Sequence, residues 1–333
     1  RDIGVTGVQT CALPISRHSK GRGINAGMKN RSLFLLVVLY AGLFFSCEPY
    51  SKQNAEKPDT PTRGEMTISA DESFRPIVDE LVKVYQGNNM STKINVLYKP
   101  EADCVKDLWN DSIRMVISTY QLTEAARVGL VDSLKIKVTQ LPVARDAVAV
   151  IVHPSSKDSY FTMTQIRQIL SGKDASKLPV FDGVKATSTV RYILDSVLKG
   201  ERLSDKAVAA RTSDSVIEYV ANHPNAVGFI GVTWVGSKDD KQQLGFLKKI
   251  KIARLESNDS TGNYILPVQA NIYGKKYPMT RDLGYILKEG RRGLGTGFSE
   301  FIVGDIGQLI FKRAYLMPGR KNFIIRPTRL NEE

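Results

Sequence analysis

The sequence predicts an α/β protein with mainly parallel sheets, because short apolar runs alternate with segments of helical periodicity. The apolar runs predict strands at residues 66–69, 94–98, 115–118, 147–153 and 226–230. The last two runs are nearly continuous, which is typical of strands that are buried on both faces. Apolar residues three and four positions apart predict amphipathic helices at 77–85, 163–170, 190–198 and 213–222.

Residues at the ends of these segments support the predicted helices. Pro76 suits the first turn of a helix, where its missing N–H would have no partner anyway. Gly172 and Gly200 follow the second and third helices, and glycine readily takes the left-handed conformation that ends a helix. The fourth helix should end at His223-Pro224, because proline cannot continue it.

Length and composition are those of a globular protein with two ordinary domains. The chain has 333 residues, of which 42 % are hydrophobic and 24 % charged, so it can bury a sizeable core. Its net charge of +13 favours anionic partners. The basic residues are spread along the chain, with no basic helix, aromatic stacking motif or zinc pattern beside them, so we do not expect a nucleic-acid partner.

The reactive residue types form no catalytic or metal-binding pattern. Cys11, Cys47 and Cys104 lie in unrelated contexts and predict no disulfide framework. The three histidines are too scattered to predict a metal site, and no cofactor is expected. The G-x-G-x-G at residues 293–297 follows a charged segment, which argues against a nucleotide-binding loop. Without a nucleophile elbow or an acid–base pair, we expect a binding protein and not an enzyme.

Residues 28–46 have the features of a secretory signal peptide. Met28 is followed by two basic residues and by an apolar run from Leu33 to Phe45. This run of about thirteen residues is shorter than the ~20 that a membrane-spanning helix needs. Ser46-Cys47 resembles a lipobox, which implies a lipid on Cys47 and an extracytoplasmic, membrane-anchored lipoprotein in the periplasm or at the cell surface. A plain buried or free cysteine is the alternative.

Two further segments are not expected to belong to the fold. The stretch at residues 5–16 resembles an in-frame translation of a sequencing-library adapter, so we interpret residues 1–27 as a non-native extension. A disordered basic extension is the alternative. Residues 47–63 are polar and contain proline, without periodic apolar positions, which is typical of a flexible tether.

Five ordered stretches of the chain resemble phosphate-binding proteins of the PstS type. They are residues 141–154 (LPVARDAVAVIVHP), 161–173, 225–231 (NAVGFIG), 277–281 (YPMTR) and 298–314. The resemblance implies a type II periplasmic-binding-protein fold, also called a Venus flytrap, in which crossing strands join two α/β lobes around the ligand. It implies one lobe from residues 64–145 and 273–333, a second lobe from 146–272, and a closing helix at 298–314. We expect a monomer.

The resemblance places the first ligand group after the first strand. Ser73 and the backbone of Phe74 match the hydroxyl and amide that bind the ligand in the family. Helix N-termini suit anions because their first N–H groups are unpaired, although Ser73 as a simple helix cap is the alternative. Asp71 and Glu72 stand where the family has small residues, so we expect them to point away or to accept a ligand proton.

The second ligand group is a run of hydroxyls. Thr187, Ser188 and Thr189 open the predicted helix at 190–198 and resemble the anion loop of the family, with capping as the alternative. The family has an arginine just upstream, where this chain reads Val180-Phe181-Asp182-Gly183. Arg191 and Arg145 are the candidates to replace that arginine.

The third ligand group departs from the family. Thr119 stands where the family has an aspartate that accepts the proton of hydrogen phosphate, and a threonine can either donate or accept. Asp71, Asp103 or Asp146 could supply the missing acceptor, and Asp146 could equally cap a turn at a hinge.

These residues together predict a receptor that captures inorganic phosphate and delivers it to the permease subunits of an ABC transporter. Two alternatives stay open. The same fold could bind another oxyanion or small acidic solute, or the chain could be a surface lipoprotein with a role in assembly or sensing.

Overall fold

The structure is a computed structural model that describes residues 59–183, 187–237 and 240–319. All of these residues belong to one compact unit, Pro58–Glu333. The predicted extension at 1–27, the signal peptide at 28–46 and the lipidation site Cys47 lie outside the described residues. Within the described ranges, no helix is both long and apolar enough to cross a membrane.

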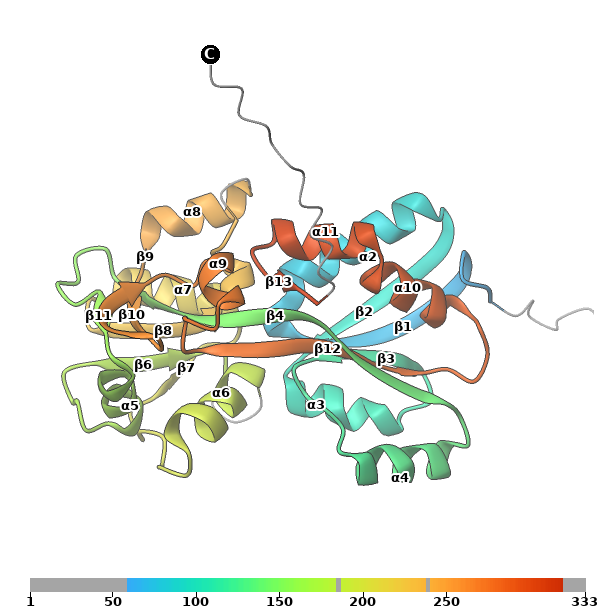
Figure 1. The fold of residues 1–333 in the computed structure, drawn as a ribbon, viewed down its shortest axis with the longest axis horizontal. Coiled ribbons are helices and arrows are strands. Elements are labelled where there is room, and N and C mark those ends of the chain that lie inside the picture. The colour runs from blue at the N-terminus through green and yellow to red at the C-terminus, as the bar shows by residue number, and fades with distance from the viewer. Residues whose placement is uncertain (1–58, 184–186, 238–239, 320–333) are drawn as a thin grey trace, which may run out of the picture. The chain divides into compact units, whose positions relative to one another are not determined.

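The first group of strands has the order β2-β1-β3-β12-β4. Strands β1, β2 and β3 are parallel to one another, whereas β12 is antiparallel to both of its neighbours. Helices α2, α10 and α11 cover one face of this sheet and α3 and α4 the other (Figure 1). The bounds of these elements are β1 Arg63–Asp71, β2 Ser91–Lys99, β3 Ile113–Ser118, β4 Val138–Val152, β12 Thr280–Lys288, α2 Arg75–Asn88, α3 Glu101–Lys106, α4 Glu124–Leu134, α10 Leu294–Val303 and α11 Asp305–Arg313.

The second group of strands continues from β4 in the order β4-β8-β6-β7, and a separate three-stranded sheet has the order β11-β10-β5. The helices of this half are α5, α6, α7, α8 and α9 (Figure 1). The strand bounds are β5 Tyr160–Phe161, β6 Leu178–Phe181, β7 Val208–Ala209, β8 Ala226–Gly231, β9 Lys251–Ile252, β10 Arg254–Ser257, β11 Ser260–Ile265 and β13 Met317–Pro318. The helix bounds are α5 Met163–Ser171, α6 Ser188–Tyr192, α7 Ser213–Asn222, α8 Lys241–Lys249 and α9 Gln269–Tyr273, and the short turns are η1 Glu72–Phe74, η2 Asp107–Trp109, η3 Ile193–Leu198 and η4 Val232–Trp234.

Strand β4 belongs to both groups. Its residues 138–147 lie opposite β12, and its residues 148–152 lie opposite β8. All pairings of β4 among the described strands are antiparallel, including those with β9 and β13. The predicted α/β class is therefore confirmed, but the parallel arrangement holds only for the outer strands of each group. The lobe boundaries near residues 145 and 273 stay a prediction.

The predicted elements differ from the observed ones mainly at their ends. All five predicted strands are present, but β4 begins at Val138. The first half of this strand was not predicted because it includes the exposed Leu141 and Pro142 and lacks a continuous apolar run. The predicted helix at 190–198 is α6 followed by a π-helical turn, and Lys199, with a φ of 51°, ends it before Gly200. The closing segment is two helices that meet at Gly304.

The glycine-rich segment at residues 293–297 lies at the start of α10. Its backbone N–H groups donate hydrogen bonds to two carboxylates of the same chain. Glu289 accepts hydrogen bonds from the N–H groups of Gly293, Gly295 and Thr296, at 3.2, 3.1 and 2.6 Å. Asp59 accepts from the N–H of Leu294 at 2.7 Å. Two arginines complete this cluster, which we call the helix clamp: Asp59, Arg114, Glu289 and Arg291.

Candidate ligand-binding site between the two sheets

A buried arginine on β12 is the centre of the candidate site. Arg281 is only 6 % exposed and lies directly opposite Asp146 of β4. Its Nε donates to Asp146 Oδ2 at 2.8 Å, and its Nη1 donates to Ser188 Oγ at 2.9 Å and to Thr189 Oγ1 at 3.2 Å. The guanidinium lies over the Phe74 ring, 4.8 Å from its centroid. Its Nη2 is buried and has no hydrogen-bond partner among the described residues.

The turn after β1 brings Ser73 to the same place from the other side. Ser73 Oγ donates to Asp182 Oδ2 at 2.8 Å and lies 3.5 Å from Ser188 Oγ. Its carbonyl oxygen accepts from Trp234 Nε1 at 2.9 Å. Its N–H already donates to Asp71 Oδ1 at 3.2 Å, so this amide is less available to a ligand than the family pattern implied. Phe74 is fully buried, and the contact above is made by its ring.

Three acids are buried around Ser73. Asp71, Glu72 and Asp182 are 0, 9 and 4 % exposed. The single O–H of Ser213 is shared between Glu72 Oε2 and Asp182 Oδ2, which lie 3.1 and 3.2 Å from Ser213 Oγ. Burial raises the pKa of Asp71 to about 7, helped by the charge of Glu101 and opposed by Arg281. Burial likewise raises the pKa of Glu72 to about 7, helped by the charge of Asp182.

We call these residues together the Arg281 chamber. They come from both groups of strands and from the strands that join them: Asp71, Glu72, Ser73, Asp146, Asp182, Ser188, Thr189, Ser213 and Arg281. Four carboxylate oxygens of the chamber, one on each acid, are buried without a hydrogen-bond partner in the described structure. Buried polar atoms are normally hydrogen-bonded, so this concentration of unpartnered atoms marks a place built to contact something else.

Thr119 and Arg191 form their own network beside the chamber. Thr119 Oγ1 donates to Glu101 Oε1 at 2.7 Å and accepts from Arg191 Nη2 at 2.8 Å. Arg191 Nε also donates to Glu101 Oε2 at 2.5 Å. Glu101 therefore supplies a carboxylate next to the position where the family has an aspartate, but this carboxylate is neutralised by Arg191.

Two of the sequence-predicted ligand residues have other partners. Thr187 caps α6, because its Oγ1 accepts the Val190 N–H at 3.3 Å. Arg145 forms a two-point ion pair with Asp282, at 2.7 and 3.2 Å, and both side chains are about one-third exposed. Neighbouring residues of a strand project to opposite faces, so Arg145 and Asp146 point away from each other. Asp146 is the one that faces the chamber.

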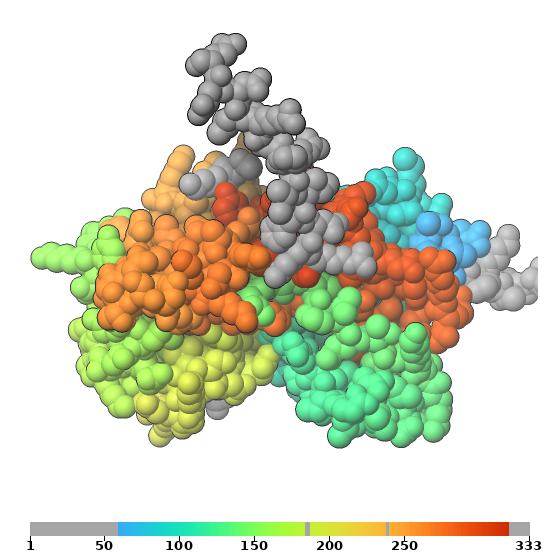
Figure 2. All heavy atoms as spheres, viewed as in Figure 1, coloured from blue at the N-terminus to red at the C-terminus, as the bar shows by residue number. Residues whose placement is uncertain are grey.

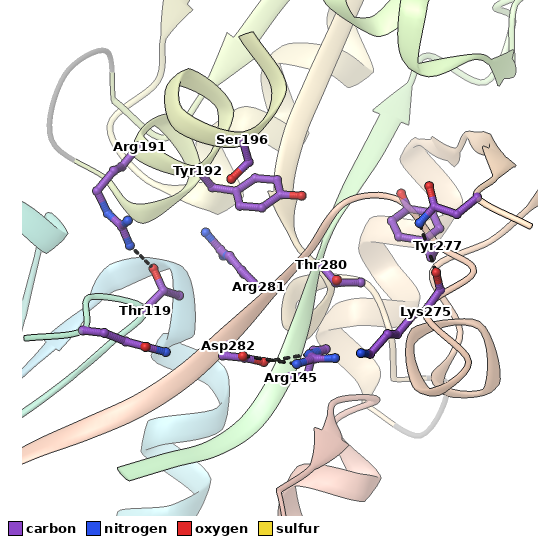
Figure 3. A pocket seen from close by; sticks show the side chains of 12 residues that line it. Thr119, Arg145, Arg191, Tyr192, Ser196, Lys275, Tyr277, Thr280, Arg281 and Asp282 are labelled. Carbon is purple, nitrogen blue, oxygen red and sulfur yellow. Dashed lines mark hydrogen bonds and ion pairs between the residues drawn. The ribbon is translucent and has the colours of Figure 1, made fainter. Parts of the chain in front are cut away.

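Two cavities flank the chamber and differ in charge. The first, of about 490 Å³, is lined by the bases Arg145, Arg191, Lys275 and Arg281 and by one acid, Asp282. Figure 3 shows Arg281 between Thr119 and Tyr192, with the Arg145–Asp282 pair beside it. Figure 2 shows the surface hollowed between the teal and the yellow segments of the chain. We call this cavity the basic mouth.

The second cavity, of about 500 Å³, we call the acidic mouth. Its described lining holds two bases, Arg75 and Lys83, against the acids Glu72, Asp79, Glu80, Asp214 and Asp240. It is formed by α2 on one side and by the start of α7 and residues beyond η4 on the other. Glu72 lines this mouth and Arg281 lines the basic one, so the chamber lies between the two.

Sequence reasoning named Ser73, Phe74, Asp146, Ser188 and Thr189, which the structure brings together. It missed the roles of Arg281, Asp182, Glu101 and Ser213. Arg281 stands in the YPMTR stretch quoted above, but its inward orientation follows from its register with Asp146, which no local pattern contains. Among the described residues, no group of three or more His, Cys, Asp or Glu side chains could hold a metal ion, and Cys104 is a buried free thiol.

Comparison with known proteins finds one family and several distant relatives. Residues 55–305 match the family described as the PBP superfamily domain. The phosphate-binding protein PstS of Borreliella burgdorferi is 20 % identical over 293 residues, which are 83 % of this chain and 94 % of the relative. This identity is low, so the relative informs the family but not the ligand.

Solved structures share the fold. A Clostridium perfringens substrate-binding protein, attributed to phosphate ABC transport and crystallised with phosphate, aligns with a TM-score of 0.64 and 18 % identity, covering 77 % of this chain and all of its own. An ABC-type phosphate transport receptor from Vibrio cholerae aligns with a TM-score of 0.56 and 16 % identity, covering 76 % of this chain and 99 % of its own. The fold is thus the mixed α/β, type II periplasmic-binding-protein fold.

Proposed function

The chain belongs to the PBP superfamily domain family, and from that membership we propose that it is an extracytoplasmic receptor that captures a phosphate group between two lobes. It would deliver this group to the permease subunits of an ABC transporter. The proposal includes the signal peptide at 28–46, the lipid on Cys47 and the lobe boundaries given above. Binding changes no covalent bond, in keeping with a family of binding proteins.

The observation that carries the proposal is the buried guanidinium of Arg281. A guanidinium presents several N–H donors in one plane and matches the oxygens of a phosphate group well. Nη2 of Arg281 has no hydrogen-bond partner in the part of the chain that the structure describes, and Nη1 points at two hydroxyls that can also donate to an oxyanion. Arg281 thus provides the guanidinium group that the family has just upstream of the anion loop and that this chain lacks there.

The hydroxyls of the chamber come from opposite sides of the cleft. Ser73 follows β1 of the first sheet, whereas Ser188 and Thr189 begin α6 in the second half of the chain. Their contacts, including the 3.5 Å approach of Ser188 Oγ to Ser73 Oγ, cross between the two halves. A phosphate group bound to these three hydroxyls and to Arg281 would hold the two halves together, which is how a receptor of this fold signals that it is loaded.

Calorimetric titration of the full chain with inorganic phosphate tests the proposal, with sulfate as the comparison anion. We expect one site per chain. Arg281→Gln should weaken binding by about 100-fold, because it removes charged hydrogen bonds worth about 1.5–3 kcal/mol each. Arg145→Gln, which removes the same charge from the neighbouring strand, should change the affinity less than about two-fold.

Ser188→Ala serves as a second variant, since Arg281→Gln also leaves Asp146 without its partner. It should weaken binding by about ten-fold while the protein melts as the wild type does. If neither inorganic phosphate nor a phosphate monoester binds at millimolar concentration, the proposed function is wrong. If Arg145→Gln and Arg281→Gln lost the same amount of phosphate affinity, the assignment of the site to Arg281 would be wrong.

A further inference from the structure

The charge of the Arg281 chamber does not suit a bare phosphate ion. Among the described residues, the chamber holds four acids against one base, Arg281, and the neighbouring Glu101 is already paired with Arg191. A phosphate dianion would add two more negative charges to a buried site. Uncompensated charge in a buried site is costly, so the ligand has to bring positive charge, or protons, together with its anionic group.

The unpartnered atoms of the chamber also indicate a ligand that carries both a positive and an anionic group. Within the described ranges, Asp71 Oδ2, Glu72 Oε1 and Asp182 Oδ1 are acceptors without a hydrogen-bond donor, whereas one donor, Arg281 Nη2, has no acceptor. Arg75 Nε lies 3.9 Å from Glu72 Oε1, and the charge of Arg281 acts on Asp71 and Asp182 without a hydrogen bond to either of them among the described residues. A hydrogen phosphate ion carries a single O–H donor, whereas an ammonium group carries three N–H donors and a positive charge. An ammonium group therefore matches these acceptors, and an anionic group matches Arg281.

The donors and acceptors are also separated in space. Arg281 contacts Ser188 at 2.9 Å, and Ser188 lies 3.5 Å from Ser73. Asp182 follows on the other side of Ser73 at 2.8 Å, and Ser213 links Asp182 to Glu72. Arg281 and the pair formed by Asp182 and Glu72 thus lie at opposite ends of this series of contacts, whereas Asp146 contacts Arg281 directly.

The two mouths extend this separation to the surface. The basic mouth adjoins Arg281, and the acidic mouth adjoins Glu72. A cleft that is positive at one end and negative at the other favours a ligand with the opposite polarity. Such a ligand is a zwitterion.

We propose that the phosphate group held by Arg281 belongs to a zwitterion, an aminoalkyl phosphate or aminoalkylphosphonate, whose ammonium group binds Asp182 and its neighbours Asp71 and Glu72. This inference rests on the proposed function, because it assumes that Arg281 binds a phosphate group. It adds the ligand class and assigns a role to acids that a phosphate site does not need.

Competition between matched ligands tests this inference on the full chain. The probes are 2-aminoethyl phosphate, ethyl phosphate, which lacks only the amine, and inorganic phosphate. We expect 2-aminoethyl phosphate to bind at least about ten-fold more tightly than ethyl phosphate, as one charged hydrogen-bonded contact would give. Asp182→Asn should reduce this ratio to within about two-fold, mainly by weakening 2-aminoethyl phosphate.

The control variant is Glu218→Gln, which removes the same charge from an exposed position on α7 that lines neither mouth, where Glu218 pairs with Lys249. It should keep the preference for the amine, because exposed charges are screened. Asp71→Asn serves as the second variant if Asp182→Asn does not fold. Equal binding of the two esters, or tighter binding of inorganic phosphate, would overturn the inference and leave the proposed function standing. Failure of all three ligands to bind would overturn both.

Discussion

The Arg281 chamber and the helix clamp are built from the same chemical groups, but they differ in how completely those groups are satisfied. In the helix clamp, each oxygen of Asp59 and Glu289 accepts at least one hydrogen bond, from Arg114, Arg291 or the start of α10. In the chamber, four carboxylate oxygens and one guanidinium nitrogen have no hydrogen-bond partner among the residues that the structure describes. A network whose members satisfy one another stabilises the fold, whereas a network left incomplete is suited to bind a ligand.

The largest effect that this comparison predicts is on stability, in the helix clamp. Glu289→Ala removes the acceptor of three backbone N–H groups and one partner of Arg114. We expect the free energy of unfolding to fall by about 2–4 kcal/mol, because buried donors lose their partner. Urea unfolding measures this loss. Ligand affinity, titrated on the folded variant, should stay within about two-fold of the wild type.

A loss of affinity in Glu289→Ala without a loss of stability would contradict the division into a structural cluster and a binding cluster. Glu289→Gln is the matched variant. It keeps one acceptor oxygen and should lose less of the stability than the alanine variant does.

The next effect is on the pH dependence of stability. The acids of the chamber should make the protein less stable as the pH rises, whereas Asp59 of the helix clamp should make it less stable as the pH falls. Asp71 and Glu72 have pKa values raised to about 7, so the folded state keeps protons that the unfolded state releases above about pH 4. Their contribution is fully present below about pH 4 and is lost as the pH rises through 7. The ligand-free protein should therefore melt about 2–4 °C lower at pH 8 than at pH 6.

Asp59 acts in the other direction. Its burial would raise its pKa, but the hydrogen bond from Leu294 and the charge of Arg114 outweigh burial and hold the pKa below its ordinary value. Its contribution is present above the ordinary value and is lost as the pH falls through the lowered one. Melting temperatures measured from pH 3 to 8 test both the loss of stability in acid and the loss above pH 6. Asp71→Asn should reduce only the fall in melting temperature between pH 6 and 8. If that fall is unchanged, Asp71 does not hold a proton in the folded protein.

The smallest effect is expected at the outer arginine of the helix clamp. Arg291 is 55 % exposed and pairs with Asp59, which also has Arg114. Arg291→Gln should cost less than about 1 kcal/mol of unfolding free energy, as exposed ion pairs usually do. Its urea midpoint should differ little from the wild type. A loss as large as that of Glu289→Ala would mean that the clamp depends on charge and not on the satisfied N–H groups.

The sequence predicted those parts of the fold that local patterns encode. The buried strands at 147–153 and 226–230 form nearly continuous apolar runs and were recognised. Strand β12, with the sequence TRDLGYILK, was not recognised as a strand, because its first half alternates between buried and partly exposed positions. The pairing of β4 with both β12 and β8 is a long-range property that no window of the sequence contains.

The same distinction applies to the candidate site. Ser73, Ser188 and Thr189 stand in recognisable stretches near helix starts, so they were named from the sequence. Asp182 and Arg281 are isolated charged residues whose burial depends on partners about 100 residues away in the chain, as the contacts of Asp182 with Ser73 and of Arg281 with Ser188 illustrate. Electrostatic complementarity between distant segments cannot be inferred from spacing alone.

The position of Arg281 also has a mechanical consequence. Arg281 and Asp146 face each other across β12 and β4, and β4 is the strand that both sheets share. The pair therefore lies at the strand that connects the two halves of the molecule. If the two halves close as proposed, a ligand bound to Arg281 would act at the strand that joins them, and the serines on either side would only have to hold the closed halves together.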